Sequence, residues 1–238
     1  IRVEAIAAAQ RALRTALGLA LAERWQATYE AMADSGPFSI EPAAMGRRAL
    51  RNVALAYLGW AGQGGEATVR QYREAGNMTD RLAALRVACD TALPERDELL
   101  ADFYAAWAGE PLVVNKWFAL QASTEDDTAP ERVSALIGHP AFTLKNPNRV
   151  RAVLATFATG NLLGFHRRDG AGYRLVTDMA LELDRLNPSV AARLLTSLGR
   201  WRRFDGKRQA LMRSELERVL ATPGLSRDSF EIASKSLG

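Results

Sequence analysis

The chain has 238 residues, of which 48% are hydrophobic and 24% are charged, and its formal net charge at pH 7 is +4. This composition supplies enough apolar residues for a sizeable core, in one large domain or two small ones. No run of 18 apolar residues is free of charge, so a membrane-spanning helix is not indicated. The single cysteine, Cys89, excludes an internal disulfide and a cysteine-based zinc site, and is compatible with a cytoplasmic protein.

The charges are divided unevenly along the chain. Residues 1–138 carry a net charge of −4, whereas residues 139–238 carry +8. A basic half suits nucleic acid, a membrane surface, an acidic neighbouring domain or the carboxylates of peptides. An ordinary solvated surface explains the same excess equally well.

Apolar residues recur at helical spacing along nearly the whole chain. Residues 2–34 predict one long helix, or two helices that meet near Gly18. Thr79 is expected to cap a helix that runs to Cys89, which is expected to be a buried core residue. On the helix at 41–60, the residues expected to face the core are Leu50, Val53, Ala54, Tyr57 and Leu58. Further helices are predicted at residues 66–75, 94–109, 111–122, 129–137, 148–159, 161–166, 172–186, 188–198, 207–220 and 228–237.

Two helix starts resemble each other. Asn146-Pro147 and Asn187-Pro188 lie 41 residues apart. Proline at the first helical position loses nothing, since its missing N–H would be unpaired there anyway, and the preceding asparagine can accept an orphan N–H of the first turn. Each start brings an arginine within about two turns, Arg151 and Arg193, so the two side chains are candidates to place positive charge at one site.

No alternating strand pattern and no Asn-Gly hairpin is present, and the 41-residue spacing falls in the range of HEAT-type two-helix units. We therefore predict an all-α fold, an irregular HEAT-like helical solenoid or superhelix of antiparallel helix pairs. Such stacks offer a concave face for binding. Because no Pro/Gly/Ser-rich linker divides residues 1–238, the chain is expected to behave as a single domain.

Seven blocks of sequence occur in a fixed order along the chain. They lie at residues 48–52 (RALRN), 77–85 (NMTDRLAAL), 116–122 (KWFALQA), 139–151 (HPAFTLKNPNRVR), 169–173 (DGAGY), 187–194 (NPSVAARL) and 204–209 (FDGKRQ). Together these blocks resemble the C-terminal helical domain of bacterial aminopeptidase N, a zinc peptidase of the M1 family. The resemblance runs essentially from end to end.

The resemblance implies that residues 1–238 are one domain of a larger bacterial enzyme whose catalytic domain is absent from this chain. It implies that the parent removes N-terminal amino acids from peptides with one zinc ion held in that catalytic domain. It also implies that Arg151 and Arg193 line the cavity above the active site and bind substrate. The implied partners are the catalytic domain of the same polypeptide and peptide substrates, with no nucleic acid and no membrane.

The chain carries no catalytic motif of its own. Zinc peptidases of this family need H-E-x-x-H on a helix, but the only histidines are His139 and His166, and neither is followed by glutamate. There is no G-x-S-x-G elbow and no phosphate-binding loop. We therefore expect no catalytic residue, metal or cofactor here, and a non-catalytic role in closing over the zinc site and controlling peptide access and position.

Two alternatives remain open from the sequence. A stand-alone helical-repeat module would use the same concave face to bind an acidic protein or nucleic acid, and Arg200-Trp201-Arg202-Arg203-Phe204 interleaves charge and aromatic rings as single-strand binders do. Packing of Trp201 and Phe204 on the core is the favoured interpretation of that run. The second alternative is structural support alone, with Arg151 and Arg193 in interhelical ion pairs.

Overall fold

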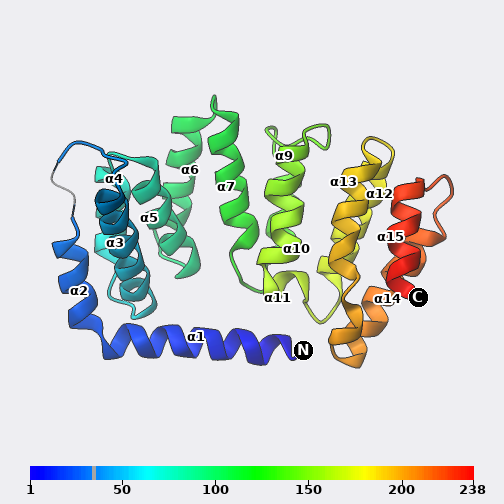
Figure 1. The fold of residues 1–238 in the computed structure, drawn as a ribbon, viewed down its shortest axis with the longest axis horizontal. Helices are drawn as coiled ribbons and strands as arrows, with labels where there is room; N and C mark the ends of the chain where they lie inside the picture. The colour runs from blue at the N-terminus through cyan, green and yellow to red at the C-terminus, as the bar shows by residue number, and fades with distance from the viewer. Residues whose placement is uncertain (34–35) are drawn as a thin grey trace. The chain divides into compact units, whose positions relative to one another are not determined.

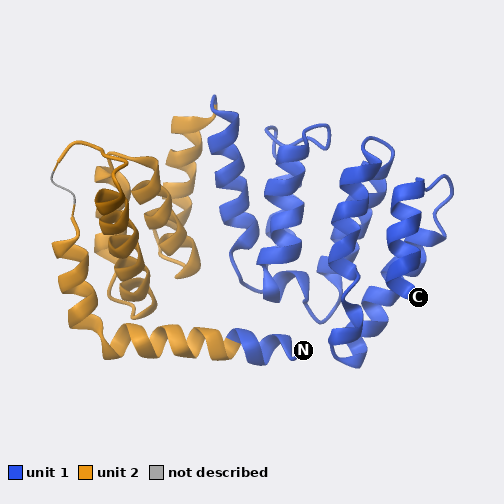
Figure 2. Ribbon diagram, viewed as in Figure 1, with its two compact units in different colours: residues 1–7, 109–238 blue, residues 8–108 orange. Residues whose placement is uncertain are grey.

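The computed structural model describes residues 1–33 and 36–238. These residues form helices joined by short links and contain no β-strand (Figure 1). None of these helices combines the length and the apolar character needed to cross a membrane. The chain divides into two compact units, residues 8–108 and residues 1–7 with 109–238 (Figure 2). The sequence has no Pro/Gly/Ser-rich linker, and the expectation that the chain behaves as a single domain stays a prediction.

The 8–108 unit contains most of α1 (Val3–Ala20), then α2 (Ala22–Ala31), α3 (Pro42–Trp60), α4 (Gly65–Glu74), α5 (Met78–Asp90) and α6 (Arg96–Trp107). Within it α3 packs on α2, α4 and α5. The link from α4 to α5 is only residues 75–77, which forces these neighbours into an antiparallel pair. The core of the unit includes Leu55, Leu58 and Leu85, each at most 1% exposed, and Cys89 is buried as expected.

The second unit, here called the 109–238 unit, also includes residues 1–7. Its helices are α7 (Pro111–Ser123), α8 (Ala129–Ile137), α9 (Pro147–Val150), the π-helix η1 (Arg151–Ala155), α10 (Thr156–Gly160), α11 (Leu162–Phe165), α12 (Ala171–Asp184), α13 (Pro188–Leu195), the short 3-10 turns η2 (Thr196–Leu198) and η3 (Trp201–Arg203), α14 (Gly206–Leu220) and α15 (Arg227–Leu237). Aromatic rings fill its centre, with Phe157 and Tyr173 each meeting Phe165 edge to face.

The structure tests the expected break in the first helix and the expected cap of α5. The first helix breaks after Ala20, two residues beyond Gly18, which confirms the two-helix alternative. Its predicted end at residue 34 lies outside the described residues. The cap of α5 was expected at Thr79, and this was wrong. Asn77 is the N-cap, and its side chain accepts a hydrogen bond from the Asp80 N–H at 3.0 Å.

The inward orientation expected for Leu50 and Val53 was also wrong. These side chains are 44% and 46% exposed, whereas Ala54 and Leu58 on the same helix are buried as expected. The reason is that α3 packs on its neighbours with the side that carries Ala54, Leu55 and Leu58. Val53 faces away from that side, and Leu50 lies at its margin. An apolar residue at helical spacing does not by itself tell which of two apolar faces is the core face.

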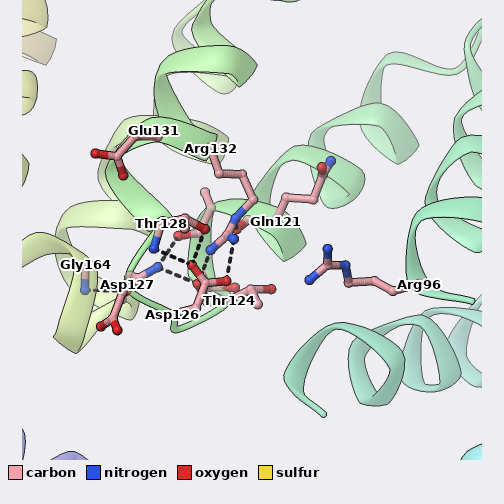
Figure 3. A network of polar contacts seen from close by, with 12 residues as sticks. Arg96, Gln121, Thr124, Asp126, Asp127, Thr128, Glu131, Arg132 and Gly164 are labelled. Carbon is pink, nitrogen blue, oxygen red and sulfur yellow. Dashed lines mark hydrogen bonds and ion pairs between the residues drawn. The ribbon is translucent and has the colours of Figure 1, made fainter. Parts of the chain in front are cut away.

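The acidic loop between α7 and α8 is held by Arg132. Its guanidinium donates to the Gln121 carbonyl at 3.1 Å, to the Thr124 carbonyl at 2.5 Å and to the Asp126 carboxylate at 2.5 Å (Figure 3). The buried amide of Asn161 donates to the same Thr124 carbonyl at 2.8 Å and caps α11 by accepting from the Gly164 N–H. The loop therefore fixes the junction of α7, α8 and α11, next to the end of α10.

Candidate functional site

Both predicted Asn-Pro helix starts are present in the structure. The Asn146 side-chain oxygen accepts from the Asn148 N–H at 3.0 Å, and Pro147 occupies the first turn of α9. The Asn187 oxygen accepts from the Val190 N–H at 3.2 Å at the start of α13. Each cap fixes the position from which its following arginine leaves the backbone.

Arg151 begins a π-helical turn. Within η1 the hydrogen bonds reach one residue further than in an α-helix, so the Thr156 N–H donates to the Arg151 carbonyl. The Thr156 hydroxyl donates to the same carbonyl at 3.1 Å. A continuous α-helix was predicted over residues 148–159, and the π turn was missed because apolar periodicity does not register a single wide turn. Such turns occur often at functional sites.

Arg151 and Arg193 line one pocket. The hollow has a volume of about 130 Å³ and lies between two walls. One wall comes from the α9–η1–α10 helix and the other from α13 and η2. The lining residues are Val150, Arg151, Ala155, Ala158, Thr159, Ser189, Val190, Arg193, Leu194, Thr196 and Ser197. The volume is close to that of a cavity that holds one benzene ring, so the pocket suits a single small group.

The polar character of the pocket comes from its two arginines. Both side chains are exposed, and Arg151 donates to the Asn148 side-chain oxygen at 2.8 Å. In the part of the chain that the structure describes, the lining contains no carboxylate. The hydroxyls of Thr159, Thr196 and Ser197 donate to carbonyls of their own helices. The donors that remain for a guest are the guanidinium N–H groups and the Ser189 hydroxyl.

This arrangement has a definite chemical capacity. Guanidinium groups pair with carboxylates through two parallel hydrogen bonds. The rest of the lining includes five apolar residues, which are Val150, Ala155, Ala158, Val190 and Leu194. The pocket can therefore receive a small anionic group that carries an apolar body.

The comparisons with known proteins cover most or all of the chain. A family model described as "Domain of unknown function (DUF3458_C) ARM repeats" matches residues 1–238. The chain belongs to this ARM-repeat family. It is 47% identical over 190 residues to aminopeptidase N of Haemophilus influenzae, 42% over 237 residues to that of Caulobacter vibrioides, and 39% over 236 residues to that of Escherichia coli.

These matches cover 80%, 98% and 98% of this chain, but only 22%, 27% and 27% of the three relatives. The chain thus spans about a quarter of their length. A crystal structure of Legionella pneumophila aminopeptidase A in complex with aspartic acid superposes with a TM-score of 0.88 at 32% identity, over 96% of this chain and 28% of that one. The similarity that the sequence blocks implied, to the C-terminal domain of bacterial aminopeptidase N, is confirmed.

Arg149 of this ARM-repeat domain is a structural residue that sequence reasoning did not single out. It is buried, and its guanidinium donates to the Ala141 carbonyl at 3.0 Å, the Pro111 carbonyl at 3.1 Å and the Asn115 side-chain oxygen at 2.6 Å. It also lies over the Phe118 ring. Arg149 therefore ties the start of α9 to α7, while Arg151, two residues later, stays exposed at the pocket.

The two histidines of the domain are packing residues. The His139 ring accepts from the Ala141 N–H through Nδ1 at 3.1 Å, and burial together with the nearby Arg149 charge lowers its pKa. The His166 Nδ1 lies 2.8 Å from the Tyr173 hydroxyl. Burial, assisted by the Arg208 charge, lowers the pKa of His166 to about 4, so its ring is neutral at pH 7.

The described residues do not fit a zinc ion. Across residues 1–33 and 36–238, no three His, Cys, Asp or Glu side chains are grouped closely enough to hold a metal. Zinc needs at least three protein ligands at a catalytic site.

The basic-aromatic run at residues 200–204 is engaged within the domain. The Trp201 N–H donates to the Ser236 carbonyl at 2.9 Å, and Arg202 covers the Trp201 ring while it donates to the Leu237 carbonyl at 2.7 Å. Phe204 stacks on His166 with ring centroids 4.2 Å apart. Trp201 thus packs at the end of α15, and Phe204 packs on the buried His166 ring. Both contacts agree with the interpretation that these aromatic residues are packing residues.

Proposed function

We propose that this chain is the non-catalytic C-terminal domain of a bacterial aminopeptidase N, and that it closes over the zinc active site of the parent enzyme. The domain forms a chamber that controls the access of peptides and positions them, while the parent removes their N-terminal residues. Zinc belongs to the catalytic domain in this proposal. The relatives named aminopeptidase N support the parent activity, and the cytoplasmic location expected from the sequence stays a prediction.

The observation that carries the proposal is the pocket shared by Arg151 and Arg193. A peptide held at its N-terminus by a catalytic site presents its C-terminal carboxylate at the other end, about 10–14 Å away for three or four extended residues. The lining offers two guanidinium groups without a carboxylate among the described residues. A carboxylate with a small side chain matches both the charge and the volume of this hollow.

Binding at the far end of a peptide can assist turnover. A hydrogen bond to a charged group contributes about 1.5–3 kcal/mol, and the lower end applies here because both arginines are exposed. Such remote binding energy raises kcat only if it aligns the scissile carbonyl, and otherwise it lowers KM alone. The proposed role is therefore positioning, with the bond cleavage done elsewhere.

The test uses the full-length parent with Arg151→Ala and Arg193→Ala combined. KM for tripeptides and tetrapeptides is expected to rise about tenfold, which corresponds to about 1.4 kcal/mol of lost binding. Hydrolysis of an alanyl anilide is expected to stay unchanged, since this substrate has no carboxylate.

Two matched variants sharpen this test. Arg185→Ala removes an exposed arginine of the same region that does not line the pocket, and it is expected to leave KM unchanged. Arg151→Lys with Arg193→Lys keeps both charges but loses the planar fork, so an intermediate KM is expected. Unchanged KM and kcat on both peptides in the double alanine variant would exclude the positioning role.

A further inference from the structure

The outward side of α3 is apolar over its first three turns. Met45 is 55% exposed, Leu50 44% and Val53 46%, and the small residues Gly46 and Ala49 are exposed between them. We call these five residues the α3 outer face. A side chain added at Gly46 would meet nothing within 4 Å. Phe38 and Ile40, 62% and 73% exposed, precede the helix and extend the apolar surface.

The polar residues of α3 are turned inward instead. Arg48 is 5% exposed and donates to the Ser39 carbonyl at 2.6 Å. Asn52 donates to the Asp80 carboxylate at 2.9 Å, inside the 8–108 unit. In α3, all of which the structure describes, Arg47 is the one charged side chain in the exposed class.

The exposed side of α3 therefore departs from the pattern of an ordinary surface helix. A helix on the outside of a domain carries charged residues toward water and an apolar stripe toward the core. Contiguous exposed apolar surface of this kind marks an interaction site in a soluble protein. The near absence of charge also matters, because permanent interfaces are more apolar than transient ones.

We propose that the α3 outer face is the docking surface for the part of the parent polypeptide that lies outside this chain. The inference rests on the proposed function, in which this chain is one domain of a larger enzyme. Relatives are about four times as long as this chain, so most of each polypeptide is tethered to this surface. A tethered partner acts at an effective concentration of about millimolar, which favours it over a second copy of the protein.

The small residues of the α3 outer face determine how closely a partner surface can approach the helix. Gly46 and Ala49 leave room between Met45, Leu50 and Val53, so backbone or small side chains of the partner can approach α3 closely. The face therefore fits an apolar surface of the adjoining domain, with no charge needed opposite it except near Arg47. A charged or polar partner surface would fit poorly, because its polar groups would be buried against apolar side chains that cannot form hydrogen bonds with them.

The experiment measures accessibility in the full-length parent. Leu50→Cys and Val53→Cys are each treated with a maleimide, and labelling is read on the peptide that carries the new thiol. Both thiols are expected to react about 100-fold more slowly than an exposed thiol, because labelling requires the interface to open. Leu186→Cys and Phe230→Cys are the matched controls, since these residues are 54% and 55% exposed and lie in the other unit.

A second measurement needs no substitution. Met45 is 55% exposed and Met212 is 0% exposed in this chain, so peroxide oxidation of the wild-type parent compares them directly. Docking predicts that Met45 is oxidised nearly as slowly as Met212. Labelling of Leu50→Cys and Val53→Cys at the control rate, together with rapid oxidation of Met45, would overturn the proposal.

The remaining outcomes separate this proposal from others. Protection that disappears on dilution, in a parent that elutes as a dimer, would assign the face to a second copy and overturn the docking proposal. Peptide hydrolysis is measured in the same samples. Protection without any hydrolysis would refute the proposed function and leave docking intact, whereas hydrolysis without protection would refute docking alone.

Discussion

At the scale of single residues, His166 couples the stability of the 109–238 unit to pH. Its ring is buried between Phe204 and Tyr173, and its backbone carbonyl accepts from the Arg208 guanidinium at 2.7 Å. Its pKa in the folded protein is about 4, compared with 6.5 for an unperturbed histidine. The unfolded chain therefore takes up this proton first as the pH falls.

The sign and window of the effect follow from these two pKa values. The contribution of neutral His166 to stability is complete above pH 6.5 and is lost as the pH falls toward 4. Between pH 7 and 4.5 the free energy of unfolding is expected to fall by about 2 to 3 kcal/mol, at 1.36 kcal/mol per pKa unit. Urea unfolding across this range measures the slope. In His166→Gln the slope should shrink to the part contributed by His139 and by the carboxylates whose pKa is lowered in the folded protein, such as Glu4. An unchanged slope would contradict the assignment.

The residues of the pocket show what the sequence could and could not predict. Asn146, Pro147, Asn187 and Pro188 fix two helix starts by local chemistry, so the positions of Arg151 and Arg193 relative to their helices were predictable. That both side chains line the same hollow depends on the packing of α13 near α10, and on the π turn at Arg151. These are tertiary features that no local pattern records.

At the scale of helices, Asp184 joins α12 to α15. Its buried carboxylate accepts from the Ser226 N–H at 2.8 Å and from the hydroxyls of Ser226 and Ser229 at 2.5 Å each. Burial acts to raise the pKa of Asp184, but the hydrogen bonds from both serines outweigh it and the pKa is lowered. Ser226 is also the N-cap of α15, so one carboxylate sets the cap of the last helix.

Removing this carboxylate is expected to loosen α15. Asp184→Ala leaves the fully buried Ser229 hydroxyl without its acceptor, which costs about 1–3 kcal/mol of unfolding free energy. Amides of α15 should exchange faster than those of α12. Glu182→Ala, an exposed position on the same helix, is the control, and an equal effect of the two variants would show that the link to α15 contributes nothing.

Helix boundaries were largely predictable, whereas helix faces were not. The bounds of α8 and the start of α7 follow from Pro111, Pro130 and the flanking glycines, because those residues restrict the backbone locally. Leu50 and Val53 were misplaced, since α3 carries apolar residues on two sides and only the partners decide which side is covered. In a domain of a larger protein, an apolar face that meets another domain looks the same in sequence as a core face.

At the scale of the whole chain, the two compact units raise the question of cooperativity. In stacked helical proteins each element contacts only its neighbours, so stability is close to a sum of local terms. Leu55 is fully buried in the 8–108 unit. Leu55→Ala is expected to lower the local stability of that unit by about 2–5 kcal/mol through the cavity that it leaves.

Hydrogen exchange resolved along the chain distinguishes local from global loss. If the units open separately, Leu55→Ala accelerates exchange in residues 8–108 and leaves residues 109–238 at the wild-type rate. Phe157→Ala, in the core of the 109–238 unit, should give the converse pattern. Equal acceleration in both units by either variant would instead identify one cooperative domain, as the missing linker suggests. We expect the local pattern, because Leu55 and Phe157 are each fully buried in the core of their own unit.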